Sequence, residues 1–90
     1  MALEILSSPA PDPEHLAEQL HDAIEAEIPA ATVRVTPSGV GHFEILVVSP
    51  AFEGKTRVAQ QQMVYRAISE FMSGGEPPVH AVDRMETRAS

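Results

Sequence analysis

The stretch from Gly41 to Gly54 limits the possible folds of this chain more than any other part of it, because it holds the most apolar run in the sequence. Within it Phe43, Ile45 and Val47 alternate with Glu44, Leu46 and Val48, as a β-strand requires. Leu46 and Val48 make the second face apolar as well, which predicts a central strand at least partly covered on both faces. Pro50 ends the strand because proline has no N–H to donate to a sheet. We therefore expect the other elements to pair with this strand or pack on it.

The segment before this strand predicts a helix followed by a short strand. Asp12 is suited to be an N-cap and Pro13 to be the first helical residue, while Pro29 ends the helix. An apolar residue recurs at every fourth position, which is typical of an amphipathic helix, at Leu16, Leu20, Ile24 and Ile28. Residues 32–36 alternate and are rich in β-branched side chains, so they predict a strand. Residues 37–41 form a turn, which favours an antiparallel hairpin with the central strand.

The segment after the central strand predicts a second helix and a last strand. Phe52 lies in a loop and is expected to tuck back onto the core. The helix should start near Lys55 or Thr56 and end near Ser73, before the Gly-Gly-Glu-Pro-Pro breaker. Residues 79–87 predict the last strand, and the helical crossover is long enough to place it parallel to the central strand. The expected fold is a small α+β domain in the order α-β-β-α-β, with a three-stranded mixed sheet and both helices on one face.

The length of 90 residues fits one domain. We expect the domain to span residues 12–90 and residues 1–11 to form a flexible N-terminal arm. The N-terminus does not resemble a secretory signal and no run of residues is long and apolar enough for a membrane span, so a cytoplasmic protein with no membrane partner is expected. The chain contains no cysteine, and it therefore cannot supply thiolate ligands or a thiol nucleophile.

The charge balance disfavours nucleic-acid binding. Thirteen acidic and six basic residues give a formal charge of −7, whereas affinity for nucleic acids depends mainly on Lys and Arg contacts to phosphates. Lys55, Arg57 and Arg66 are the candidate basic patch, although solvated charges on a helix face are the commoner case.

No motif supports an enzyme. The Gly39-Val40-Gly41 fragment lies in a strand-to-strand turn and lacks the following helix that would hold a phosphate. None of the serines lies in a pattern resembling a nucleophile elbow. Glu44 and Glu53 are ordinary surface carboxylates unless a cleft brings them together. We therefore expect a non-enzymatic protein.

The histidines are the candidate site. His15 and His21 belong to the first predicted helix and are expected to face solvent. His42 and His80 each stand where a loop enters a strand, and imidazole is a common ligand of zinc, copper and iron. Two histidines do not complete a tetrahedral site, so a partner would have to complete it. Ordinary histidines at strand ends are the alternative, and the residues alone favour it.

Four segments together resemble the BolA family, and they occur in the family's order and spacing. These segments are Gly41–Ser49, Phe52–Lys55, Val58–Tyr65 and Val79–Val82. The resemblance extends from about Asp12 to Thr87. It implies an α-β-β-α-β domain related to the type II KH fold, in agreement with the order expected from the residues.

The resemblance also implies a function. BolA-like proteins are partners of monothiol glutaredoxins, and the pair can share a 2Fe-2S cluster held also by a glutaredoxin cysteine and the thiol of glutathione. The family's histidine near the start of the last strand corresponds to His80. A second ligand comes from the region between the first two strands, where His42 is the best match. Val40 stands where some members have a cysteine and cannot bind a metal. Alone, the protein is expected to hold no cofactor and to be a monomer.

The resemblance leaves a DNA-binding regulator as the alternative function. Many members carry Arg-His before the apolar part of the second helix, a region that has been compared with a helix-turn-helix. The matching residues here are Gln60 and Gln61, which lack the positive charge, although glutamine can hydrogen-bond a base edge. The glycine loop of KH domains is also absent, so the KH likeness concerns the fold only.

Overall fold

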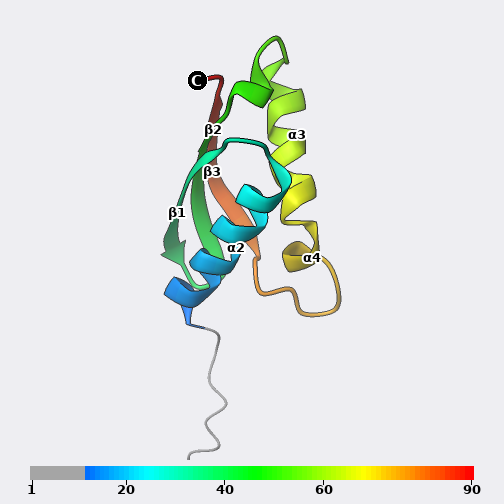
Figure 1. Ribbon diagram of the computed structural model, residues 1–90. Helices are drawn as coiled ribbons and strands as arrows, with labels where there is room; N and C mark the ends of the chain where they lie inside the picture. Colours follow the sequence, from blue (N-terminus) through cyan, green and yellow to red (C-terminus); the bar gives the residue numbers. More distant parts are fainter. Residues whose placement is uncertain (1–11) are drawn as a thin grey trace, which may run out of the picture.

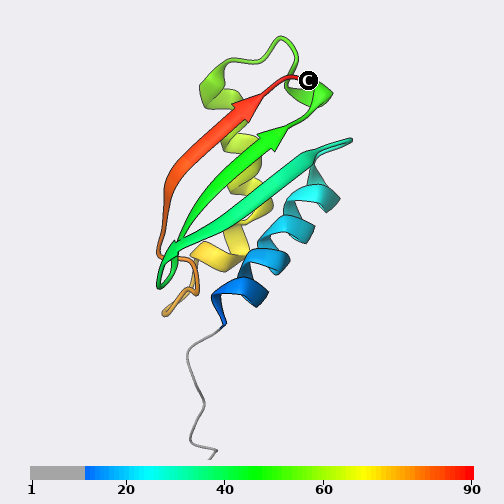
Figure 2. The ribbon, with the colours of Figure 1, turned by 90° about the vertical axis from the view of Figure 1, so that its left-hand side faces the viewer.

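The computed structural model describes residues 12–90; the predicted flexible arm, residues 1–11, lies outside the described residues. The sheet lies on one side of the domain and the helices on the other (Figures 1 and 2). The elements in chain order are α2 (Pro13–Glu27), β1 (Thr32–Gly39), β2 (His42–Val48), the 3-10 turn η1 (Pro50–Phe52), α3 (Arg57–Ala67), α4 (Ser69–Met72) and β3 (Ala81–Arg88).

The sheet has the predicted topology. Its three strands lie in the order β1-β2-β3, with β2 in the centre. β1 and β2 are antiparallel, and β2 and β3 are parallel. Figure 2 shows the sheet in front of the helices, which all lie behind it. The mixed sheet and the α-β-β-α-β order are therefore confirmed, with α4 as a short addition to the second helix.

Both neighbours of β2 carry one extra residue near the start of that strand. In β1, Pro37 pairs with Phe43 and Gly39 pairs with His42, so Ser38 has no partner across the ladder. In β3, Val82 pairs with Phe43 and Arg84 pairs with Glu44, so Asp83 is the unpaired residue. Bulges of this kind bend a strand and re-aim a side chain.

The core lies between the sheet and the helices. α2 begins as predicted, with the side chain of Asp12 accepting a hydrogen bond from the N–H of Glu14 and Pro13 in the first turn. Phe52 is fully buried, which confirms that the loop after β2 returns to the core. The buried apolar residues are Leu16, Ala17, Leu20, Ile24, Ile28, Phe43, Ile45, Val47, Phe52, Val64, Ile68 and Val79.

The second predicted helix is divided into two. Thr56 caps α3 by accepting a hydrogen bond from the N–H of Ala59. The buried residue Ile68 leaves helical geometry, with φ −111° and ψ 13°, and α4 follows at once. This break turns the chain toward β3, and the carbonyl of Phe71 in α4 then accepts a hydrogen bond from the N–H of Val79 at 3.0 Å. The strand predicted to begin at Val79 starts two residues later, at Ala81.

The face of the sheet opposite the helices has no covering element among residues 12–90, so the predicted two-sided cover of β2 is only partial. Leu46 and Val48 are half-buried by side chains of the neighbouring strands. Arg84, Glu86 and Arg88 of β3 line this face in a row of ion pairs. Within the described part of the chain, no helix has both the length and the apolar character required to cross a bilayer.

Candidate functional site at the start of β2

The structure brings His42 and His80 together. Their ring centroids are 6.4 Å apart and the rings meet edge to face at 84°. His42 is the first residue of β2, and His80 directly precedes β3, whose residue Ala81 is the partner of His42 in the parallel ladder. Parallel pairing therefore places two loop-to-strand junctions, far apart in the sequence, at one end of the sheet.

One bulged residue, Asp83, contacts a ring nitrogen of His42, and the other, Ser38, hydrogen-bonds Asp83. Nδ1 of His42 lies 2.9 Å from Oδ1 of Asp83, and the hydroxyl of Ser38 donates to Oδ2 of Asp83 at 3.0 Å. The hydrogen bond with His42, and then that with Ser38, lower the pKa of Asp83 below its ordinary value. An ionised carboxylate only accepts hydrogen bonds, so Nδ1 of His42 carries the proton and Nε2 of the neutral ring keeps its lone pair. A carboxylate placed in this way is typical of histidines that bind metals.

His80 is placed by Gly41. The carbonyl of Gly41 accepts hydrogen bonds from the N–H of His80 at 2.7 Å and of Ala81 at 3.2 Å. Gly41 has φ 74°, and a Cβ atom at this position would stand 2.6 Å from Nδ1 of His80. The imidazole of His80 therefore packs against the backbone of Gly41, and any other residue at position 41 would push the imidazole away.

A groove next to His80 adds apolar surface to this end of the molecule. It has a volume of about 800 Å³ and runs between the start of α2, the β1–β2 turn and the loop before β3. Val40 lines it and is 77% exposed at the tip of the turn. Its other apolar lining residues are Pro13, Leu16, Phe43, Pro77 and Pro78.

The donor set suits part of a metal centre. It offers two imidazoles, one exposed and one with its second nitrogen held by a carboxylate, and the chain has no cysteine. Imidazole is a ligand of iron, zinc and copper. An iron-sulfur centre also requires thiolates, which would have to come from another molecule.

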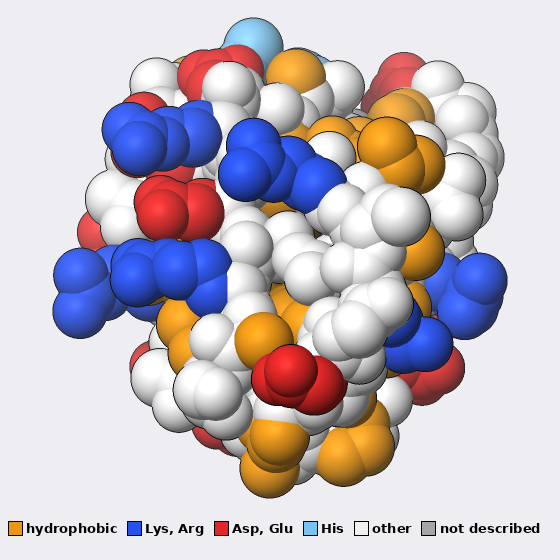
Figure 3. Space-filling model, turned by 90° about the horizontal axis from the view of Figure 1, so that it is seen from above, with side chains coloured by type: hydrophobic (Ala, Val, Ile, Leu, Met, Phe, Trp, Pro, Cys, Tyr) orange, Lys and Arg blue, Asp and Glu red, His pale blue; other side chains and the backbone are white. Residues whose placement is uncertain are grey.

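The predicted basic patch is spread along α3. Lys55 precedes the helix, Arg57 is its first residue and Arg66 lies in its last turn, roughly 13 Å from Arg57 at the rise of an α-helix. Arg57 instead shares a groove of about 370 Å³ with Arg84 and Arg88 of β3. Figure 3 views the domain from the end at which β2 finishes; it shows basic side chains on both the left and the right of this face, with an acidic side chain between those on the left.

Gln60 and Gln61 of α3 make hydrogen bonds within the domain. The amide nitrogen of Gln60 donates to the carbonyls of Phe52 at 3.2 Å and Lys55 at 3.0 Å, and its oxygen accepts from the hydroxyl of Thr87 at 2.8 Å. Gln61 donates to the carbonyl of Met85 at 3.4 Å. These contacts fasten α3 to β3, so the two side chains are not free to contact bases.

These features define a small α+β domain with a mixed three-stranded sheet and two histidines at one end of it, and comparison with known proteins identifies its family. The family model described as BolA-like protein matches residues 17–89. The chain therefore belongs to the BolA-like family, as the resemblance in its sequence indicated.

Individual relatives agree with this assignment. The chain is 39% identical over 66 residues to an Acinetobacter guillouiae protein named "Uncharacterized protein in rpoN-murA intergenic region", a match that covers 73% of this chain and 76% of that protein. A bolA protein homologue from Coxiella burnetii has a TM-score of 0.66 and 26% identity, covering 80% of this chain and 87% of the other. BolA1 from Arabidopsis thaliana shares the fold, with a TM-score of 0.65 at 20% identity over 81% of this chain and 89% of its own.

Proposed function

We propose that this chain is a non-enzymatic partner of a monothiol glutaredoxin in iron-sulfur cluster trafficking or iron homeostasis. In this proposal the two proteins share a 2Fe-2S cluster, and His80 and His42 are the ligands supplied by this chain. The observation that carries the proposal is the meeting of these two imidazoles at one exposed end of the sheet, 6.4 Å apart. Family membership supports the same function.

Each residue of the site has a distinct part in this function. His80 is exposed and presents its ring to an approaching partner, while Gly41 supports that ring from behind. Asp83 keeps the proton of His42 on Nδ1, which leaves Nε2 available as a ligand. The glutaredoxin cysteine and glutathione supply the thiolates that this chain lacks. A histidine ligand raises the reduction potential of an iron-sulfur cluster compared with a thiolate.

Mixing the protein with a cluster-loaded monothiol glutaredoxin tests the proposal. We expect the visible absorption and circular dichroism of the mixture to differ from the sum of the two components. His80→Ala should remove most of this difference and His42→Ala part of it. His15→Ala is the matched control, because His15 is an exposed histidine on α2 whose loss should leave the spectra unchanged. Spectra of the mixture that equal the simple sum would refute the shared cluster.

A second candidate function is DNA binding by a transcriptional regulator. The observation in its favour is the groove that Arg57 shares with Arg84 and Arg88, although Glu86 also lines this groove and pairs with both arginines of β3. Titration of duplex DNA at low and moderate salt tests it, since contacts to phosphates give an affinity that falls steeply with salt. Arg57→Ala should then weaken binding more than Arg66→Ala, because Arg66 lies at the other end of α3. Absence of binding at low salt would exclude this function.

A further inference from the structure

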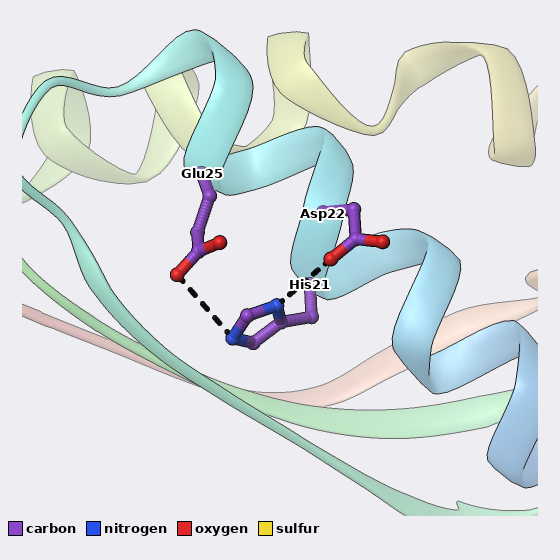
Figure 4. Close-up of side chains that lie close together, drawn as sticks. All are labelled: His21, Asp22 and Glu25. Atoms are coloured by element: carbon purple, nitrogen blue, oxygen red, sulfur yellow. Dashed lines mark hydrogen bonds and ion pairs between the residues drawn. The ribbon is translucent and has the colours of Figure 1, made fainter.

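A second histidine cluster lies on α2, away from the start of β2. His21 has a carboxylate at each ring nitrogen: Nδ1 is 3.2 Å from Oδ1 of Asp22, and Nε2 is 3.6 Å from Oε2 of Glu25. Figure 4 shows the two carboxylates on opposite sides of the imidazole, which extends from α2 toward the sheet. One potential ligand atom from each of the three residues lies within 4.8 Å of the others.

The two distances have different chemical meanings. The contact with Asp22 is short enough for a hydrogen bond, so the carboxylate of Asp22 can accept a hydrogen bond from Nδ1–H of His21. The contact with Glu25 is too long for one. Two ligand atoms that each lie about 2.0 to 2.1 Å from one tetrahedral ion are about 3.3 Å apart. The separation of 3.6 Å between Nε2 of His21 and Oε2 of Glu25 is close to this value. The pair His21 and Glu25, four residues apart on one helix face, is thus spaced as two ligands are.

The surroundings favour a cation. From Asp12 to Ile28 the chain has six acidic residues and no Lys or Arg. His21 lines an open groove of about 610 Å³ between α2 and β1, together with Glu14 and Glu18. Arg34 of β1 is the one basic residue among those lining the groove. The groove gives water access to the remaining coordination positions.

We propose that α2 binds a divalent transition metal such as Zn²⁺, with Nε2 of His21 and a carboxylate oxygen of Glu25 as ligands and Asp22 orienting the ring through Nδ1. A nitrogen and an oxygen donor together suit Zn²⁺, Cu²⁺ or Ni²⁺, whereas Mg²⁺ and Ca²⁺ are bound by oxygen alone. The ion also links two successive turns of α2, so binding stabilises the folded domain.

The same helix provides a matched control. His15 and Glu18 are three residues apart, with Nδ1 and Oε1 separated by 3.8 Å. The side chain of His15 is 68% exposed, compared with 37% for His21. No second carboxylate contact of His15 is present among residues 12–90, so His15 tests whether any exposed histidine beside a carboxylate would bind the metal equally well.

Calorimetric titration with Zn²⁺ tests this site in a His42→Ala/His80→Ala background, which removes the other candidate ligands. We expect one ion per chain and a thermal unfolding midpoint that rises with Zn²⁺ and falls again with EDTA. His21→Ala and Glu25→Gln should each weaken binding at least tenfold, and Asp22→Asn about tenfold, as orienting partners of metal-bound histidines do. His15→Ala should leave binding unchanged.

Three results would overturn the proposal. The first is no Zn²⁺ binding by the His42→Ala/His80→Ala protein, and the second is unchanged Zn²⁺ affinity when His21→Ala is added to it. The third is an affinity for Mg²⁺ equal to that for Zn²⁺, which would indicate a general attraction of the acidic helix for cations. Far-ultraviolet dichroism of each variant checks that α2 is still folded, and His21→Gln provides a second variant that keeps a polar side chain. Because the background lacks His42 and His80, the outcome is independent of the proposed glutaredoxin function.

Discussion

The two ends of β2 both carry polar side chains, but these side chains are used differently. At the end of the strand, Ser49 is fully buried; its hydroxyl donates to the carbonyl of Pro29 at 2.6 Å and accepts from the N–H of Ala51 at 3.0 Å. At the start, His42 and Asp83 are each 42% exposed. The hydrogen-bonding groups of Ser49 are all used within the fold. His42 and Asp83 stay accessible to solvent, so polarity alone does not distinguish a buried structural position from a candidate site.

The largest expected difference between the two ends comes from their serines. Ser49→Ala leaves the carbonyl of Pro29 without its donor and the N–H of Ala51 without its cap, and we expect it to lower the free energy of unfolding by about 2 kcal/mol. Ser38→Ala removes an exposed hydrogen bond to Asp83 and should cost less than about 0.5 kcal/mol. Urea unfolding of both variants measures the contrast. Equal losses would show that the start of β2 is as structural as its end.

A pair of glycines gives the next contrast. Gly41 and Gly54 have similar φ angles, 74° and 78°, so alanine strains the backbone by about 1–2 kcal/mol at either place. Only at Gly41 would the new methyl group also meet the ring of His80, whereas no atom lies within 4 Å at Gly54. Gly41→Ala should therefore lower stability more than Gly54→Ala and shift the nuclear magnetic resonance signals of His80. An unshifted imidazole would contradict the contact between Gly41 and His80.

The smallest expected effect concerns pH. The pKa of Asp83 is lower in the folded state than its ordinary value, because His42 and Ser38 hydrogen-bond its carboxylate. The stabilisation is therefore fully present above about pH 4 and is lost as the pH falls through the lower folded-state pKa. Asp83→Asn lacks this titration, so its urea midpoint should approach that of the unmodified protein as the solution is acidified. Midpoints that stay equally separated at every pH would exclude this contribution.

The sequence was sufficient for most of the fold because the main signals are local. The alternation from His42 to Val48, the cap at Asp12 and the Gly-Gly-Glu-Pro-Pro breaker each depend on residues close together in the chain. The division of the second helix at Ile68 could not be predicted in this way. Ile68 is an ordinary helical residue by its sequence, and its departure from helical geometry accompanies the contact between Phe71 and Val79.

The candidate site was predicted in part. The two histidines could be named from their positions beside loops, and parallel pairing then brought them together. Asp83 and Ser38 were missed because their roles depend on extra residues in two ladders, and Asp83 is 41 residues from His42. His21 was expected to face solvent, but it is half-buried beside β1, because that expectation took no account of the side chains across the groove.

The two bulged residues next to His42, Ser38 and Asp83, have no partner in the strand pairing of the sheet. In the β2–β3 ladder, the pairs on either side of Asp83 are Val82 with Phe43 and Arg84 with Glu44, and Phe43 and Glu44 are consecutive residues of β2. Ser38 is skipped in the β1–β2 ladder in the same way. Neither Ser38 nor Asp83 is paired with a residue of β2 in the sheet. Substitutions at these two positions can therefore change the surroundings of His42 while the three strands keep their pairing.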